Sequence, residues 1–150
     1  MESLNCKSLM IGDYVLVKPS MMLIKVAAVH HKKVGYHAVT HKLNWVRMDL
    51  LKPIPLTSEI LERNAFELNG ELPFRKEFRI CFNEDTEDER HLFVEYHHKS
   101  DYVKLTYQTY TGHHNGTNGI VINHCGVHQF QHALRICGLD ELADNLKLEE

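Results

Sequence analysis

Histidine is the residue type with most potential for chemistry in this chain, because twelve histidines occur in 150 residues. Three of them, His124, His128 and His132, follow one another at intervals of four. Side chains four residues apart share one face of a helix, so His128 and His132 could bind one metal ion. The chain has neither HExxH nor CxxC to supply further zinc ligands. We therefore expect no metal and no other cofactor, and a metal-dependent enzyme using these histidines is an alternative.

The helix that carries these histidines is predicted for residues 126–137. Apolar residues recur there at helical spacing, and they predict a buried stripe of Val127, Phe130, Leu134 and Cys137. His128, His132 and Arg135 lie off this stripe, which predicts an exposed face that binds a partner. Substitutions on such a face should leave stability nearly unchanged.

Nucleophilic catalysis has one local candidate, Cys125 beside His124. The sequence has no GxSxG motif, no P-loop and no GxGxxG motif. The glycine-rich segment 112–119 precedes a strand pattern, whereas a phosphate-binding loop would precede a helix, so we predict a hairpin turn there. These observations predict a protein that is not an enzyme.

The four cysteines are scattered and too sparse for a disulfide framework. They are Cys6, Cys81, Cys125 and Cys137. We expect reduced, mostly buried thiols.

Cations and aromatic residues occur together near the N-terminus. Residues 1–55 hold eight Lys or Arg and three Asp or Glu, whereas residues 56–150 hold nine and seventeen. Aromatic rings stack on bases and cations attract phosphates, so this part could bind nucleic acid or a nucleotide. The candidate ligand-binding residues are Lys25, Tyr36, Lys42, Trp45 and Arg47. Trp45 is equally compatible with a core position.

Three segments of the chain resemble a known family. They are GDYV at 12–15, PIPLTSEILERNAF at 53–66 and VHQFQHAL at 127–134. Together they resemble an uncharacterised family of small proteins from phages and mobile elements of gut bacteria, and the resemblance spans most of the chain. The shared motifs are structural, so the resemblance implies a context rather than catalytic residues. That context is a phage or mobile-element accessory protein acting inside a bacterial cell.

The elements that must position these residues predict an α+β fold. Short apolar strands at 14–17, 22–29, 34–39 and 43–48 alternate with polar turns, which is typical of an SH3-like small β-barrel. Thr57 caps a short helix that ends at Asn64.

Residues 74–122 then predict an antiparallel β-meander of about four strands, with an acidic loop at 83–90. We expect the helix at 126–137, capped by Gly138, and a second helix from Asp140 to cover the meander. The predicted domains are 1–55 and 56–150, and short linkers favour one compact unit.

No apolar run is long enough to span a membrane, and the N-terminus has no features of a signal peptide, which predicts a cytoplasmic protein of the bacterial host cell. The leading functional hypothesis is a non-enzymatic binding protein. Its partner would be a host protein or a small anionic, nucleotide-like ligand, as for a counter-defence factor. The alternative is nucleic-acid binding through the basic N-terminal barrel. Self-association into a homo-oligomer is compatible with either hypothesis.

Overall fold

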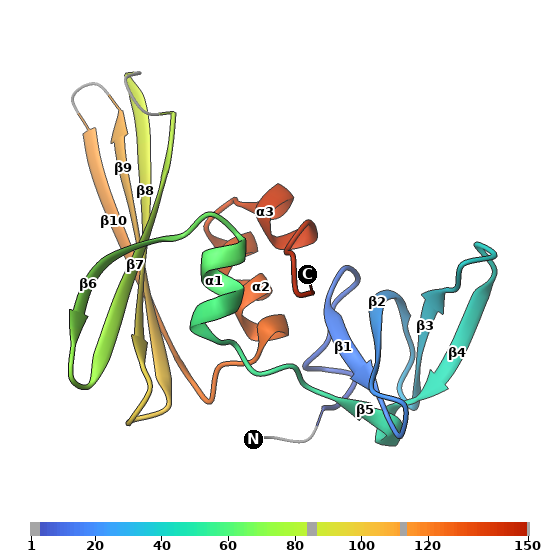
Figure 1. The fold of residues 1–150 in the computed structure, drawn as a ribbon. Helices are drawn as coiled ribbons and strands as arrows, with labels where there is room; N and C mark the ends of the chain where they lie inside the picture. Colours follow the sequence, from blue (N-terminus) through green and yellow to red (C-terminus); the bar gives the residue numbers. More distant parts are fainter. Residues whose placement is uncertain (1–3, 84–86, 112–113, 150) are drawn as a thin grey trace. The chain divides into compact units, whose positions relative to one another are not determined.

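The computed structural model describes residues 4–83, 87–111 and 114–149. The chain divides into two compact units, each built from two segments (Figure 1). Met1–Pro55 and Gly126–Asn145 form the first unit, and Leu56–Cys125 and Leu146–Glu150 form the second. This division differs from the expected domains 1–55 and 56–150, because the C-terminal helices belong with the N-terminal strands.

The first unit contains an antiparallel five-stranded sheet in the order β4-β3-β2-β1-β5. Its elements are β1 (Tyr14–Val17), β2 (Met22–Val29), β3 (Lys33–His37), β4 (Leu43–Arg47), the 3-10 helix η1 (Met48–Leu50) and β5 (Leu51–Lys52). Alternate strand residues face one core, which includes Val15, Val17, Ile24, Val26, Val34 and Leu51. All four strands predicted in this part are present, but within the described residues the sheet does not close on itself.

The C-terminal helices α2 (Val127–Ile136) and α3 (Asp140–Asp144) complete the first unit. The predicted glycine cap of α2 is confirmed. Gly138 has a φ of +76°, its N–H donates to the Arg135 carbonyl at 2.9 Å, and the Leu139 N–H donates to the Leu134 carbonyl at 2.9 Å. These two bonds satisfy carbonyls that the helix itself leaves unpaired. Within the described residues, every helix is too short or too polar to span a bilayer.

The buried side chain of Gln131 ties α2 to the N-terminal strands. Its Oε1 accepts a hydrogen bond from the Tyr14 N–H at 2.9 Å, and its Nε2 donates to the Gly12 and Ala143 carbonyls at 3.0 and 2.8 Å. A buried polar residue beside the apolar stripe thus anchors the helix. The expectation that α2 and α3 cover the meander overlooked this anchor.

The second unit contains α1 (Ser58–Arg63) and an antiparallel sheet in the order β10-β9-β8-β7-β6. Its strands are β6 (Glu67–Leu72), β7 (Arg75–Phe82), β8 (Asp88–His97), β9 (Tyr102–Thr111) and β10 (His114–Asn123). Thr57 caps α1 as predicted, since its Oγ1 accepts from the Ile60 N–H at 3.4 Å.

The meander has five strands, one more than predicted, because β6 lacks the apolar alternation that marks a strand in sequence. The turn predicted at 112–119 is mostly wrong, because β10 begins at His114. Residues 112 and 113, and residues 84–86 of the acidic loop, lie outside the described residues. The remainder of that loop is short, since β8 already begins at Asp88.

One face of the second sheet is apolar and buried, as the alternation predicts. Phe78, Val94 and Leu105 are neighbours across β7, β8 and β9, and each is at most 1% exposed. Along each strand, the residues that alternate with these point to the opposite face. Polar and aromatic side chains such as Arg79, Phe93 and Thr106 lie there. The one-faced pattern of an antiparallel sheet is confirmed for these strands.

Candidate functional site

The polar side of α2 is buried, so the prediction that this face is exposed is wrong. His128 is only 5% exposed. His132 donates from Nε2 to Asp13 Oδ2 at 2.7 Å, and Arg135 donates from Nη1 to Asp13 Oδ1 at 2.8 Å. Within the first unit these side chains face the loop before β1. Because His132 and Arg135 pair with a buried carboxylate, their role is structural.

The two histidines of α2 are poorly arranged to share a metal ion. Their rings are nearly perpendicular, with centroids 6.1 Å apart, and His132 Nε2 is occupied by Asp13. Burial lowers the pKa of His128, which favours a neutral ring. At the helical spacing that suggested a metal site, His128 packs in the interior and His132 makes a hydrogen bond to Asp13.

Cys125 is a poor nucleophile in this structure. Burial raises its pKa to about 12, so the thiolate is scarce at neutral pH. The ring of His124 bonds to the Asp101 carboxylate through Nδ1. All four cysteines are thiols, but only Cys125 is buried, whereas Cys6, Cys81 and Cys137 are half-buried.

An exposed surface of aromatic and basic residues lies on strands β3 and β4 of the first unit. Strand pairing sets Lys33 opposite Arg47, Gly35 opposite Trp45 and His37 opposite Leu43. Apart from Gly35, these residues are all exposed. We call this set the β3–β4 face. The intervening residues Val34 and Val46 point to the core, so the alternation of the two strands creates the face.

Trp45 is the central side chain of the β3–β4 face and is 45% exposed. The Lys33 ammonium lies over its ring, 4.7 Å from the centroid. A Cβ at Gly35 would come within 3.1 Å of Leu43 Cδ1 and 3.4 Å of the Trp45 ring. Glycine at this position therefore lets the indole lie close against the strand beside it.

The structure separates the candidate residues predicted in this part of the chain. Trp45 and Arg47 share the β3–β4 face, and Lys42 is exposed in the turn that precedes β4. Tyr36 points to the other side of β3, where it packs against the core. Lys25 is exposed on β2, and its Nζ donates to the Asp144 carbonyl at 2.6 Å.

An open cleft of about 520 Å³ lies in the first unit and includes Lys25. It is lined by Ile11, Gly12, Lys25, Val26, Ala27, His37 and Asp144. His37 belongs both to this cleft and to the β3–β4 face. The cleft has the size of a small-molecule site, and Lys25 supplies a cation at its wall.

Lys33 and His37 are the residues of this surface that sequence reasoning missed. The signal that identifies them is the length of the β3–β4 connection. Residues 38–42 link the strands, and this fixes the pairing of Lys33 with Arg47 and of His37 with Leu43. In an antiparallel pair, directly opposite residues and their neighbours two positions along share a face, so Lys33 is a diagonal neighbour of Trp45.

The chain was compared with protein-family models, curated proteins and solved structures, and none of them matches. The resemblance to proteins of phages and mobile elements therefore stays a prediction that rests on the three quoted segments.

Proposed function

We propose that the protein is a non-enzymatic binding protein that binds single-stranded nucleic acid through the β3–β4 face. The exposed indole of Trp45, with the Lys33 ammonium over its ring, carries this proposal. Base-on-aromatic stacking contributes about 1–3 kcal/mol per base and tolerates any sequence. Single strands suit this arrangement because their bases are available for stacking.

Cations surround the stacking position and supply the attraction to phosphates. Lys32, Lys33, Lys42 and Arg47 are exposed on or beside β3 and β4. Arg47 pairs with Asp49 at 2.6 Å, but both side chains are more than half exposed. Such a surface pair contributes at most about 1 kcal/mol, so a phosphate can replace the carboxylate at little cost.

We also propose that the first sheet is an SH3-like barrel. Two features support this finer description of the fold: the strand order β4-β3-β2-β1-β5, and the 3-10 helix η1 between β4 and β5. The pairing of β2 with β3 has a register irregularity between Val26 and Ala28. Irregularities of this kind bend a strand, as a strand shared by two halves of a barrel requires. Small barrels of this class present strand faces to ligands, which agrees with the position of Trp45.

Intrinsic fluorescence tests the proposal directly, because Trp45 is the single tryptophan of the chain. The purified protein is titrated with a thymine oligonucleotide at about pH 7.5 and low salt. Stacking should quench or shift the emission. The logarithm of the association constant should fall linearly with the logarithm of the salt concentration. Binding with unchanged emission would place the nucleic acid elsewhere on the protein.

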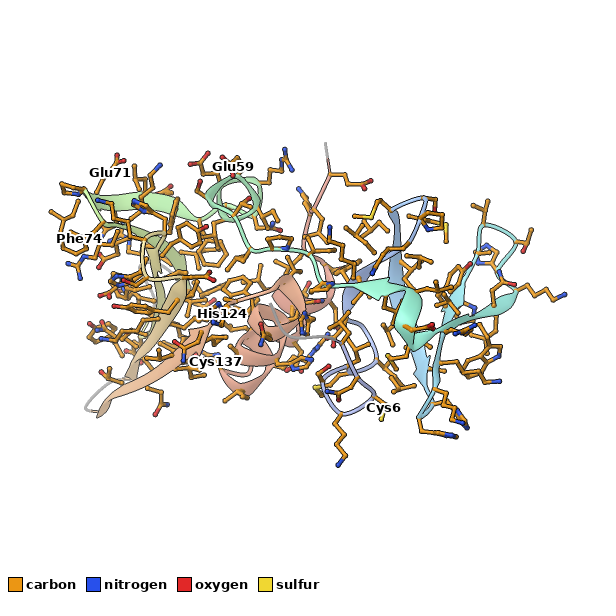
Figure 2. All side chains as sticks on the ribbon, turned by 90° about the horizontal axis from the view of Figure 1, so that it is seen from below. Cys6, Glu59, Glu71, Phe74, His124 and Cys137 are labelled. Carbon is orange, nitrogen blue, oxygen red and sulfur yellow. The ribbon has the colours of Figure 1, made fainter. Side chains whose placement is uncertain are left out.

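Variants measured by anisotropy of a labelled oligonucleotide separate stacking from charge. Trp45→Ala should weaken binding by about 5- to 150-fold, which corresponds to the loss of one stacked base. Lys33→Ala should reduce the salt slope by about one. The matched controls are Phe74→Ala, an exposed aromatic in the β6–β7 turn (Figure 2), and Lys99→Ala, an exposed cation of the second unit. Equal losses in controls and test variants would contradict the proposal.

The cleft beside His37 supports a second candidate, a small anionic ligand bound near Lys25. This proposal retains the expected nucleotide-like ligand and needs no stacking on Trp45. A mononucleotide that binds with an affinity sensitive to Lys25→Ala but insensitive to Trp45→Ala would favour it over the nucleic-acid proposal. Either function would suit the proposed accessory protein of a phage or mobile element inside a bacterial cell.

A further inference from the structure

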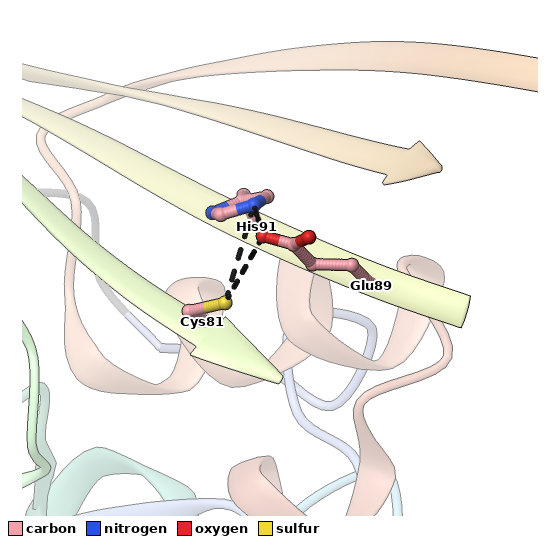
Figure 3. A group of neighbouring side chains, drawn as sticks. All are labelled: Cys81, Glu89 and His91. Carbon is pink, nitrogen blue, oxygen red and sulfur yellow. Dashed lines mark hydrogen bonds and ion pairs between the residues drawn. The ribbon is translucent and has the colours of Figure 1, made fainter. Parts of the chain in front are cut away.

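Three side chains of different chemistry meet on the second sheet, on the face opposite its buried core. Cys81 lies on β7, and Glu89 and His91 lie two residues apart on β8, where His91 is the cross-strand partner of Cys81. Figure 3 shows the three side chains turned toward one another. His91 Nε2 lies 2.6 Å from Glu89 Oε1 and 4.0 Å from Cys81 Sγ, and Sγ lies 3.8 Å from the same Oε1.

The geometry distinguishes a metal site from a catalytic triad. In a triad the acid and the nucleophile bind opposite nitrogens of the histidine. Here the thiol and the carboxylate both face Nε2, while Nδ1 is buried and has no hydrogen-bond partner within the described residues. One sulfur, one nitrogen and one oxygen converge on a single point, and a cation is the group that such a convergence can hold.

The separations are close to those of a tetrahedral zinc ion. Zinc bonds of about 2.3 Å to sulfur and 2.0–2.1 Å to nitrogen and oxygen place tetrahedral ligand atoms about 3.3–3.6 Å apart. The nitrogen and oxygen atoms now share a hydrogen bond at 2.6 Å and would have to separate by about 0.7 Å. The sulfur would approach both by less than that. Small side-chain rotations are sufficient, so the backbone need not move.

Aromatic neighbours hold the histidine ring in place. The ring of His91 stacks on Phe93 at 6.0 Å between centroids and meets Tyr110 edge-on at 5.6 Å. The side chain of His91 is 14% exposed, whereas that of Glu89 is 35% exposed. The ligands are thus partly preorganised and still reachable from solvent, so an ion can enter and a water can bind beside them.

We propose that Cys81, Glu89 and His91 form a Zn²⁺ site with three protein ligands and a fourth position filled by water. A thiolate and an imidazole favour zinc over magnesium or calcium, which prefer ligand sets made of oxygen. Binding releases the thiol proton of Cys81 to water and displaces the hydrogen bond between His91 and Glu89. The neutral His91 ring then carries its proton on Nδ1, so that Nε2 offers its lone pair to the ion. This site is independent of the β3–β4 face, which lies in the other unit.

Cobalt titration tests the site with a spectroscopic readout. The full-length, untagged and reduced chain is stripped with a chelator and titrated with Co²⁺, which takes the same ligands as zinc and is coloured. One equivalent should produce a thiolate-to-cobalt charge-transfer band together with the intense visible bands of tetrahedral cobalt. One equivalent of Zn²⁺ should abolish both bands. Bands typical of six-coordinate cobalt, or no charge-transfer band, would overturn the proposal.

Variants assign the ligands. Cys81→Ser should remove the charge-transfer band, and His91→Gln and Glu89→Gln should each weaken zinc binding by at least about 100-fold, since changes to outer-shell partners alone cost 10- to 100-fold. The controls are Cys137→Ser, another half-buried thiol, and His124→Gln, an exposed histidine paired with Asp101. Thermal melting in chelator confirms that each variant folds. Unchanged zinc affinity in folded Cys81→Ser, or equal loss in the controls, would overturn the proposal.

Discussion

Asp13 is a fully buried carboxylate on the loop before β1, and three groups donate hydrogen bonds to it. They are the Met10 N–H at 2.7 Å, His132 Nε2 at 2.7 Å and Arg135 Nη1 at 2.8 Å. A buried charge is tolerated only when it is paired and hydrogen-bonded. The cluster therefore explains why His132 and Arg135, which lie off the apolar stripe of α2, contact the buried Asp13 on the loop before β1.

Replacing Asp13 with Asn should destabilise the protein by about 3 kcal/mol, at the lower end of the cost of breaking a buried pair. The Arg135 guanidinium loses its buried partner and keeps only its bond to the half-exposed Asp144 carboxylate. Urea denaturation followed by circular dichroism measures the loss. Asp49→Asn is the matched control, since Asp49 pairs with Arg47 at an exposed position. That change should cost at most about 1 kcal/mol. A similar loss of unfolding free energy in both variants would show that the buried pairing of Asp13 stabilises the protein no more than the exposed pair does.

At the scale of the element, the sequence predicted the two ends of α2 well. It did not predict which residues of α2 contact other parts of the chain. The apolar spacing and Gly138 located both ends of the helix within a residue or two. The helical wheel could not show which side faces another element, because the bonding partners lie far apart in sequence. Gln131 is 117 positions from Tyr14, and His132 is 119 positions from Asp13. Long-range polar pairs of this kind leave no periodic signal.

The β7–β8 hairpin presents the same difficulty on a smaller scale. Cys81 and His91 are ten residues apart, and only the register of the hairpin makes them neighbours. A shift of one residue in that register would turn His91 to the opposite face from Cys81. The alternation of β7 and β8 is predictable from the sequence, but their register is not, so the grouping of Cys81, Glu89 and His91 leaves no signal in the sequence.

The apolar stripe of α2 gives a prediction at the scale of the helix. Phe130 is fully buried, so Phe130→Ala should cost about 3–5 kcal/mol through lost transfer free energy and the cavity that remains. Ile136 on the same helix is 76% exposed, and Ile136→Ala should change stability by no more than about 0.5 kcal/mol. Denaturant midpoints of both variants measure the difference. A larger loss for Ile136→Ala would mean that the helix is rotated about its axis.

At the scale of the molecule, the chain leaves the first unit after Pro55, builds the second, and returns at Gly126. The return is fixed by backbone pairing within the first unit, since the Val127 N–H donates to the Ile54 carbonyl at 2.8 Å. The sequence predicts a break at Pro53–Pro55, and the first segment of the first unit ends at Pro55. No sign of the return appears in the sequence, because the strands of the second unit run into α2 without a linker of distinct composition.

Net charge is a property of the whole molecule, and twelve histidines make it unusually sensitive to pH. The chain carries −3 with neutral histidines and has an isoelectric point of about 6.4. Protonation of exposed histidines below that point makes the protein cationic, so repulsion between molecules is weakest near it. We expect a solubility minimum near pH 6.4, measured by precipitation across about pH 5 to 8 at constant low salt. A flat profile would mean that the histidines titrate outside this range. The cationic form should also bind any nucleic acid more tightly, so specific binding at Trp45 has to be measured above the isoelectric point.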